Sequence, residues 1–232
     1  MKNINKKLYI IDKSYLNEDW QSLIDDMPLW RQEATKKFAV NEPKKLSLLA
    51  SILYERMMRE IGVYEDIKNI KVSYNQYGKP FIEEEKYKDI KFNISHTKDK
   101  VILSVSDEEV GCDIEKIRDL DINIAKRFFT ENEYRYIYDI KNIDIQKAVF
   151  YKIWTMKESI AKYIGKGLSM GLDSVDINDI DIRDLLDNKE KQKTITFFNN
   201  GSIFYFHNFD MKDYMTTICT KSDKKFSVVK IL

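Results

Sequence analysis

The sequence contains few residues that cross-link or break a chain. Its 232 residues include two cysteines, three prolines and seven glycines. Cys112 and Cys219 cannot build a disulfide framework, and both stand in apolar runs, so we expect small core residues. No apolar run approaches the length of a membrane-spanning helix, and LYII near the N-terminus is too short for a signal peptide. We therefore expect a cytoplasmic protein.

Net charge is also nearly absent, because 39 Lys and Arg balance 38 Asp and Glu to leave +1. Broad electrostatic binding to nucleic acid or to an anionic membrane is therefore not expected. Zinc-ligand spacings, the P-loop and the GxGxxG dinucleotide fingerprint are missing too. The hydrophobic content of 43% predicts a globular protein with a sizeable core, in one large domain or two small ones.

Apolar periodicity predicts a mixture of helices and strands in each half of the chain. Thr130 and Glu133 form a capping-box pattern that should begin a helix, and Gly165 is a typical helix stop. We expect the apolar runs 101–105 and 110–115 to pair as a hairpin. The predicted strands are 8–11, 72–74, 90–94, 101–105, 110–115, 195–198, 203–207 and 216–219, and the predicted helices are 44–61, 122–129 and 146–164.

The segment VGCDIE, residues 110–115, carries two carboxylates one residue apart in an apolar, strand-like run. Side chains at i and i+2 of a strand point to the same face, so Asp113 and Glu115 should project together and repel each other. Water, a basic partner or a metal ion would each relieve that repulsion. Mg²⁺ prefers oxygen ligands and usually takes one or two carboxylates. A solvated strand face is an equal alternative.

A third carboxylate lies in the helix predicted over residues 146–164. Glu158 and Lys162 stand four residues apart and therefore share one face of that helix. Taken alone, they are typical of an exposed ion pair that contributes roughly 0.2–0.5 kcal/mol. Beside Asp113 and Glu115, however, Glu158 would complete an oxygen-rich site.

Two further segments carry polar groups next to apolar structure. Ser95 and His96 follow the predicted strand in FNISHT, but adjacent residues of an extended chain point apart and no GxSxG elbow occurs, so a hydrolase pair is not indicated. Hydrogen bonding to phosphate oxygens suits them better, and a turn role for His96 is the alternative. Lys166 lies between Gly165 and Gly167, where the backbone can approach a ligand closely. A plain helix C-terminus is the alternative there.

Six segments follow one another between residues 74 and 177, namely YGKP, FNISHT, VGCDIEK, IAKRFFTENEY, FYKIWTMKESIAKYIGKGLSM and LDSVDI. In this order they resemble the Sfp-type (surfactin-synthetase-activating) 4′-phosphopantetheinyl transferases. The resemblance implies an α+β fold, a pseudo-twofold pair of similar halves with the active site in the cleft between them, and a monomer. We expect residues 1–108 to form the half that contacts coenzyme A, and residues 109–232 the half with the metal-binding carboxylates and the catalytic helix.

The resemblance also implies a reaction, in which the 4′-phosphopantetheine arm of coenzyme A moves to a serine of an apo carrier protein and 3′,5′-ADP is released. The carrier would belong to peptide, polyketide or fatty-acid synthesis. Asp113, Glu115 and Glu158 would hold Mg²⁺, or alternatively Mn²⁺, against the pyrophosphate. Glu158 would be the base for the serine hydroxyl, directly or through water, and Lys162 would stabilise the leaving phosphate.

The coenzyme A contacts implied by the resemblance lie mostly in the first half. Ser95, His96, Arg31 and Ser47 would surround the 3′-phosphate. Ala34 stands where a second basic residue is common, and Lys36, Lys37 or Lys44 would substitute for it. The full set of expected coenzyme A-binding residues is Arg31, Ser47, Gly78, Lys79, Pro80, Ser95, His96, Lys162 and Lys166, of which Gly78, Lys79 and Pro80 would line the adenine side.

An acidic carrier protein would need a complementary surface. Within Ile117–Tyr138, Phe128 and Phe129 are surrounded by basic residues and form a candidate docking patch. The alternative is that both rings belong to the core. Two other functions stay open, a different Mg²⁺ enzyme acting on a nucleotide pyrophosphate and a non-catalytic module that binds coenzyme A or a carrier. The basic residues of the candidate patch are Arg118, Lys126, Arg127 and Arg135.

Overall fold

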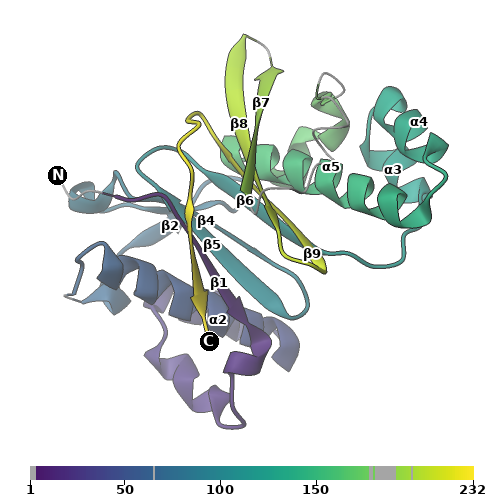
Figure 1. The fold of residues 1–232 in the computed structure, drawn as a ribbon. Helices are drawn as coiled ribbons and strands as arrows, with labels where there is room; N and C mark the ends of the chain where they lie inside the picture. The colour runs from purple at the N-terminus through teal and green to yellow at the C-terminus, as the bar shows by residue number, and fades with distance from the viewer. Residues whose placement is uncertain (1–3, 65, 178–179, 181–191, 200) are drawn as a thin grey trace. The chain divides into compact units, whose positions relative to one another are not determined.

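The computed structural model describes residues 4–64, 66–177, 180, 192–199 and 201–232. The chain forms two compact units, one of Met1–Val110 with Phe226–Leu232 and one of Gly111–Lys225. Each unit packs a long helix against a four-stranded sheet (Figure 1). The predicted α+β class and its two halves are confirmed. In the described part of the chain, no helix is both long enough and apolar enough to span a bilayer.

The sheet of the first unit has the strand order β10-β1-β5-β4. The central strand β5 pairs antiparallel with β1 on one side and β4 on the other, and β10 pairs parallel with β1. A separate antiparallel hairpin joins β2 and β3. The strand bounds are β1 (Lys7–Asp12), β2 (Val72–Tyr74), β3 (Pro80–Ile82), β4 (Lys91–His96), β5 (Lys100–Ser106) and β10 (Ser227–Ile231).

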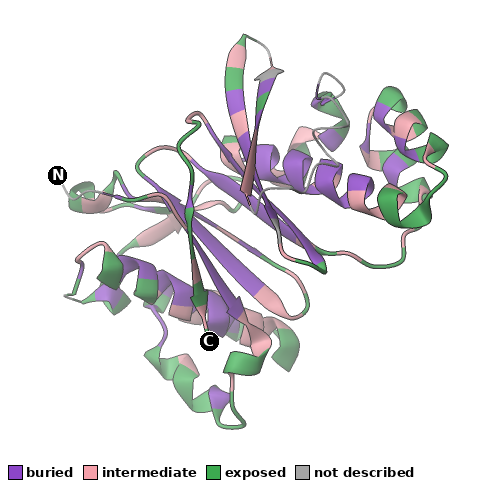
Figure 2. Ribbon diagram, viewed as in Figure 1, coloured by how far each residue is buried: buried purple, intermediate pink, exposed green. Residues whose placement is uncertain are grey.

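Helix α2 (Asn41–Glu60) covers this sheet with one apolar face. Leu49, Leu53 and Met57 recur every four residues along that face and are fully buried. Burying each of these side chains contributes about 1.5–3 kcal/mol to the free energy of folding. Much of α2 is coloured as buried in Figure 2. The other helical segments of this unit are α1 (Leu29–Lys36) and the 3₁₀ turns η1 (Lys13–Tyr15), η2 (Trp20–Asp26), η3 (Ile67–Asn69) and η4 (Glu85–Tyr87).

The sheet of the second unit is antiparallel throughout, with the strand order β6-β9-β8-β7. The long helix α5 packs on β6 and β9 and is buried along most of its length (Figure 2). The bounds are β6 (Gly111–Lys116), α3 (Asn123–Phe128), α4 (Glu131–Asp139), α5 (Ile143–Ile164), η5 (Gly167–Met170), η6 (Leu172–Ser174), β7 (Gln192–Asn199), β8 (Ser202–Asp210) and β9 (Tyr214–Thr220).

Local sequence signals set the helix ends of the second unit. Thr130 and Glu133 form the predicted capping box of α4. Asn142 caps α5 by accepting hydrogen bonds from two backbone N–H groups, and Gly165 ends the helix in the left-handed conformation at φ 80°. The predicted capping box and the predicted stop at Gly165 are confirmed, whereas α5 begins at Ile143, three residues before its predicted start.

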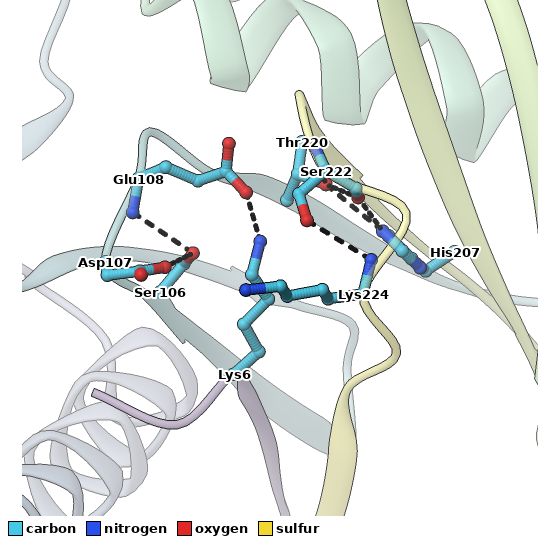
Figure 3. Close-up of polar contacts among 8 residues, drawn as sticks. All are labelled: Lys6, Ser106, Asp107, Glu108, His207, Thr220, Ser222 and Lys224. Carbon is cyan, nitrogen blue, oxygen red and sulfur yellow. Dashed lines mark hydrogen bonds and ion pairs between the residues drawn. The ribbon is translucent and has the colours of Figure 1, made fainter. Parts of the chain in front are cut away.

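Polar contacts inside each unit hold strand ends in place (Figure 3). In the first unit, Lys6 forms an ion pair with Glu108, and its ammonium lies 5.8 Å from the centre of the Phe226 ring. In the second unit, the buried His207 ring lies 3.2 Å from Thr194 Oγ1 on one side and 3.1 Å from Thr220 Oγ1 on the other. His207 is therefore a core residue of the second sheet.

A fully buried ion pair joins α4 and α5 to the segment that follows α5. Lys157 Nζ lies 2.7 Å from Glu133 Oε2, with side chains 0% and 1% exposed. The ammonium also donates to the carbonyls of Leu172 and Val175, while Glu133 Oε1 accepts from Ile177 N at 2.9 Å. Burial lowers the pKa of Lys157, and the charge of Glu133 opposes that shift. The Lys157–Glu133 pair thus also hydrogen-bonds three backbone groups of the segment that follows α5.

Two sequence-based expectations differ from the structure. The hairpin predicted between runs 101–105 and 110–115 is wrong, because β1 and β4 already occupy both edges of β5 and β6 pairs with β9. We also assigned all of residues 109–232 to the second half. The units instead divide after Val110, and β10 returns to pair with β1 of the first unit. Parallel pairing with a strand at the other end of the chain leaves no local turn signal.

We predict that Lys157→Met lowers the free energy of unfolding by about 3–5 kcal/mol, because it leaves Glu133 as an unpaired buried charge. Chemical denaturation monitored by circular dichroism measures this loss.

The matched control is Arg135→Met, which breaks the exposed Arg135–Glu131 pair on α4 and should cost less than about 1 kcal/mol. The double variant Lys157→Met/Glu133→Gln should be more stable than Lys157→Met alone. Equal losses for Lys157→Met and Arg135→Met would contradict the assigned role of the buried pair.

Candidate active site

Strand β6 turns its acidic face toward α5. Gly111, Asp113 and Glu115 alternate along the strand and therefore share one face. A Cβ atom at Gly111 would lie 2.1 Å from Ser159 O and 2.3 Å from Tyr163 N, both backbone atoms of α5. This contact identifies the helix that the shared face meets.

Gly111 sets how closely β6 approaches α5. Backbone atoms of a helix cannot rotate away as a side-chain tip can, so distances this short leave no room for a methyl group. The glycine is thus required by the contact between the two elements. Because the strand lies this close to the helix, Asp113, two residues further along the strand, comes within reach of the last turn of α5.

Asp113 pairs with Lys162 across this contact. Lys162 Nζ lies 2.6 Å from Asp113 Oδ1, and the Asp113 side chain is 5% exposed against 25% for Lys162. Glu158, one turn earlier on α5, is only 9% exposed. The alternative of an exposed Glu158–Lys162 surface pair is therefore wrong, and the structure brings Lys162 to the strand carboxylate instead.

The electrostatics of the site reflect crowded negative charge. Burial, together with the charges of Asp113 and Glu158, raises the pKa of Glu115 to about 7, although Lys162 and Arg118 act in the opposite direction. Burial also raises the pKa of Glu158, with Lys162 opposing and Asp113 adding to the shift. For Lys162, burial lowers the pKa, but the charge and hydrogen bond of Asp113 together with the charges of Cys112 and Glu158 outweigh it, and the net shift is upward. The solvated strand face is therefore excluded for Asp113, which is buried and paired.

The carboxylate oxygens of Asp113, Glu115 and Glu158 suit a hard divalent cation, but they are not arranged as a metal site in this structure. Carboxylate oxygens are the ligands that Mg²⁺ prefers, and the three carboxylates act on one another electrostatically. Nevertheless, the described residues hold no group of three or more His, Cys, Asp or Glu side chains arranged to bind a metal ion. An ammonium stands at Asp113 in this structure.

Arg31 and Ser47 come together in the first unit. Arg31 Nη2 lies 3.4 Å from Ser47 O, and its guanidinium stacks 5.3 Å from the Trp30 ring centre. Burial lowers the pKa of Arg31, and Tyr74 opposes the shift. Ser47 Oγ shares a hydrogen bond with Thr35 Oγ1 at 2.5 Å. Arg31 and Ser47 are therefore neighbours, and the buried Ser47 hydroxyl is occupied by Thr35.

Lys79 and its neighbours shape the β2–β3 hairpin. Gly78 adopts φ 89° in the turn, a conformation that favours glycine, and Pro80 begins β3. Lys79 Nζ forms an ion pair with Glu109 and donates to Val110 O at 3.0 Å. Its ammonium is therefore tied to the last residues of the first unit.

The remaining expected binding residues differ in accessibility. At the end of β4, Ser95 is buried and His96 is exposed. Lys166 is exposed directly after the α5 cap. Of the lysines proposed to replace a basic residue at Ala34, Lys36 and Lys37 are exposed and Lys44 is half-buried. The coenzyme A-binding roles expected for these residues therefore remain predictions.

Comparison with known proteins identifies the family. The model for the 4′-phosphopantetheinyl transferase superfamily matches residues 109–219, and the model for the N-terminal part of a 4′-phosphopantetheinyl transferase matches residues 15–108. The 4′-phosphopantetheinyl transferase gsp of Aneurinibacillus migulanus is 33% identical over 72% of this chain and 68% of its own. The corresponding transferase ffp of Bacillus subtilis is 35% identical over 74% and 75%, and Sfp of Bacillus subtilis (strain 168) is 36% identical over 69% of each.

The chain belongs to the 4′-phosphopantetheinyl transferase superfamily. The family predicted from the order of the six motifs is confirmed, and with it the class of enzyme, since these relatives are named as transferases. Among solved structures, the holo-[acyl-carrier-protein] synthase of Thermotoga maritima aligns with 48% of this chain and 61% of its own at 15% identity and a TM-score of 0.27, too low for an argument about fold.

Only some residues of the candidate docking patch of this transferase lie at the surface. Phe129 is buried in the core of the second unit, so the core alternative holds for that ring. Phe128 is half-buried and meets Trp154 edge-on at 5.4 Å, with the Arg127 guanidinium 5.1 Å from its centre. Arg135 pairs with Glu131. Phe128 and Arg127 are the members that fit the expected patch best.

Sequence reasoning missed two residues that organise the site of the transferase. Gly111 was visible in VGCDIE, and its position two residues before Asp113 on the same strand face was the available signal. Lys157 was missed, because lysines are almost always exposed and its partner Glu133 lies on another helix. No local pattern signals such a pair.

We predict that Gly111→Ala lowers the free energy of unfolding by about 3 kcal/mol, because the added methyl group overlaps the backbone of α5 and the strand must move. Denaturant unfolding measures the loss.

The control is Gly201→Ala, where no atom lies within 4 Å of the new Cβ and only the left-handed backbone at φ 73° is strained, at a cost of about 1 kcal/mol. A Gly111→Ala protein as stable as the wild type would show that β6 does not depend on this close approach.

Proposed function

We propose that this chain transfers the 4′-phosphopantetheine arm of coenzyme A to a serine of an apo carrier protein and releases 3′,5′-ADP. One observation carries the proposal. In a member of this family, the carboxylates of β6 (Asp113 and Glu115) face the charged residues of α5 (Glu158 and Lys162). A binder that does no chemistry has no need for buried carboxylates with raised pKa values.

The proposed step forms one bond and breaks one. The serine oxygen bonds to the phosphorus that bears the pantetheine arm, and the bond from that phosphorus to the oxygen of the nucleotide phosphate breaks. The serine proton passes to Glu158, directly or through water, and 3′,5′-ADP leaves with the electron pair. The raised pKa of Glu158 supports this role, since a carboxylate shifted toward neutrality is a better proton acceptor.

Charge neutralisation is the other requirement of phosphoryl transfer. Lys162 would meet the negative charge on the leaving phosphate. We propose that Asp113, Glu115 and Glu158 hold Mg²⁺, with Mn²⁺ as an alternative, on the basis of their oxygen donors and mutual repulsion. When bound, the cation would neutralise the pyrophosphate. Asp113 would have to exchange its present contact with Lys162 for the cation.

The binding roles in the first unit follow the same proposal. Arg31 and Ser47 would bind the 3′-phosphate together with Ser95 and His96. The adenine side would be lined by Gly78, Lys79 and Pro80, with Lys79 oriented by Glu109. Lys166 would lie beside the pyrophosphate. The proposed oligomeric state is a monomer, supported by the presence of two compact units in one chain. The proposed location is the cytoplasm.

The first test is intact-mass spectrometry of apo peptidyl, polyketide and fatty-acid carrier proteins after incubation with the protein, coenzyme A and Mg²⁺. We expect the mass of one phosphopantetheine arm to be added, and the addition to stop when Mg²⁺ is chelated. Glu158→Gln should reduce the rate by at least about 10²-fold, while Glu131→Gln, an exposed acid on α4, should not. Normal transfer by folded Glu158→Gln would refute the base, and no transfer to any carrier would refute the function.

A second test concerns the 3′-phosphate. Arg31→Met keeps the packing against Trp30 but removes the charge, so it should weaken coenzyme A binding about 10-fold or more, the size of a lost charged hydrogen bond. Calorimetric titration with coenzyme A and with 3′-dephospho-coenzyme A measures the effect. The dephosphorylated ligand should bind both proteins equally, and equal weakening of the two ligands would remove Arg31 from the phosphate site.

A further inference from the structure

The Asp113–Lys162 contact places a cation of the chain itself at the carboxylate that the proposed reaction needs for a metal. The two charged atoms lie 2.6 Å apart. Asp113 is held on a central part of β6, which pairs with β9 over six residues. Gly111 keeps that strand against the backbone of α5. Asp113 therefore has little freedom to leave the contact.

Lys162 has more freedom than its partner. It lies in the last turn of α5, three residues before the Gly165 cap, and its side chain is 25% exposed. A lysine has a flexible four-carbon stem and three donors in its ammonium group. It can turn toward solvent or toward an anion without unpacking the helix.

The exchange of partners must be coupled. The ammonium on Asp113 Oδ1 repels a divalent cation at the same carboxylate, and removing Lys162 alone would leave a buried carboxylate without its counter-charge. The described residues hold no group of three or more side chains arranged to bind a metal ion, and Asp113 is paired with Lys162. A pyrophosphate offers Lys162 a more highly charged partner than a single carboxylate.

We propose that Lys162 is a built-in counter-ion that keeps divalent cations off Asp113 until the pyrophosphate of coenzyme A draws its ammonium away. This inference rests on the proposed function, because coenzyme A is the ligand that supplies the pyrophosphate. Metal and coenzyme A then bind cooperatively, and by linkage each tightens the other by the same factor. The free protein avoids holding a metal without substrate.

The test is the affinity of the full-length protein for Mn²⁺, measured from the electron paramagnetic resonance signal of free Mn²⁺, with and without coenzyme A. Without coenzyme A, Lys162→Met should bind Mn²⁺ about 10-fold more tightly than the wild type, since the competing ammonium is gone. Coenzyme A should then increase Mn²⁺ affinity in the wild type by a larger factor than in Lys162→Met.

Two control variants separate the contact from general charge effects. Lys162→Arg keeps a cation that reaches Asp113 and should behave like the wild type. Lys147→Met removes a charge from the other end of α5, where Lys147 pairs with Asp119 at 2.7 Å, and should leave Mn²⁺ affinity unchanged. A similar gain in Lys147→Met would attribute the effect to net charge and overturn the inference.

Further results of the Mn²⁺ titrations and of a carrier-modification assay also test the counter-ion role of Lys162. Equal Mn²⁺ affinities for wild type and Lys162→Met without coenzyme A, or equal gains on adding it, would overturn the inference. Carrier modification by the same wild-type preparation tests the proposed function separately. A wild type that modifies carriers but shows no effect of Lys162 would retain the function and lose only the counter-ion role. A wild type that modifies no carrier would lose the function, and the Mn²⁺ titrations would still decide the role of Lys162.

Discussion

The close approach of Gly111 to the backbone of α5 is the constraint on which the candidate site depends. Because the strand touches the helix at Ser159 and Tyr163, the next residue on the same strand face comes within reach of Lys162, which lies between these two positions. Asp113 and Lys162 are therefore paired by the geometry of two elements rather than by the flexibility of their side chains. A larger residue at position 111 would separate the strand from the helix and, with it, the charges that they carry.

The position of α5 is fixed in turn by the buried ion pair between Lys157 and Glu133 of α4. Lys157 precedes Glu158 in the sequence, is completely buried, and binds Glu133 and two backbone carbonyls. A buried ion pair adds little net stability compared with apolar packing, but its geometry tolerates few alternatives. Adjacent residues of α5 thus have separate tasks, with Lys157 holding the helix and Glu158 facing the acidic site.

Local patterns predicted the elements better than they predicted the pairing of the elements. The capping box at Thr130 and the stop at Gly165 act within one helical turn, so sequence alone was enough to find them. The pairing of β6 with β9 and of β10 with β1 depends on partners far away in the chain, and those pairings were missed or assigned to a hairpin. The order of motifs identified the family, but a motif cannot say which charge a lysine contacts.

Lys162 illustrates that limit. Its spacing from Glu158 suggested a surface pair within one helix, whereas the strand carboxylate is the stronger partner because it is buried and its attraction is screened less by water. The same burial that raises the pKa of Glu115 and Glu158 makes a counter-charge necessary at Asp113. A site that must hold several carboxylates together needs a cation in every state, and a lysine within the chain supplies one before any ligand arrives.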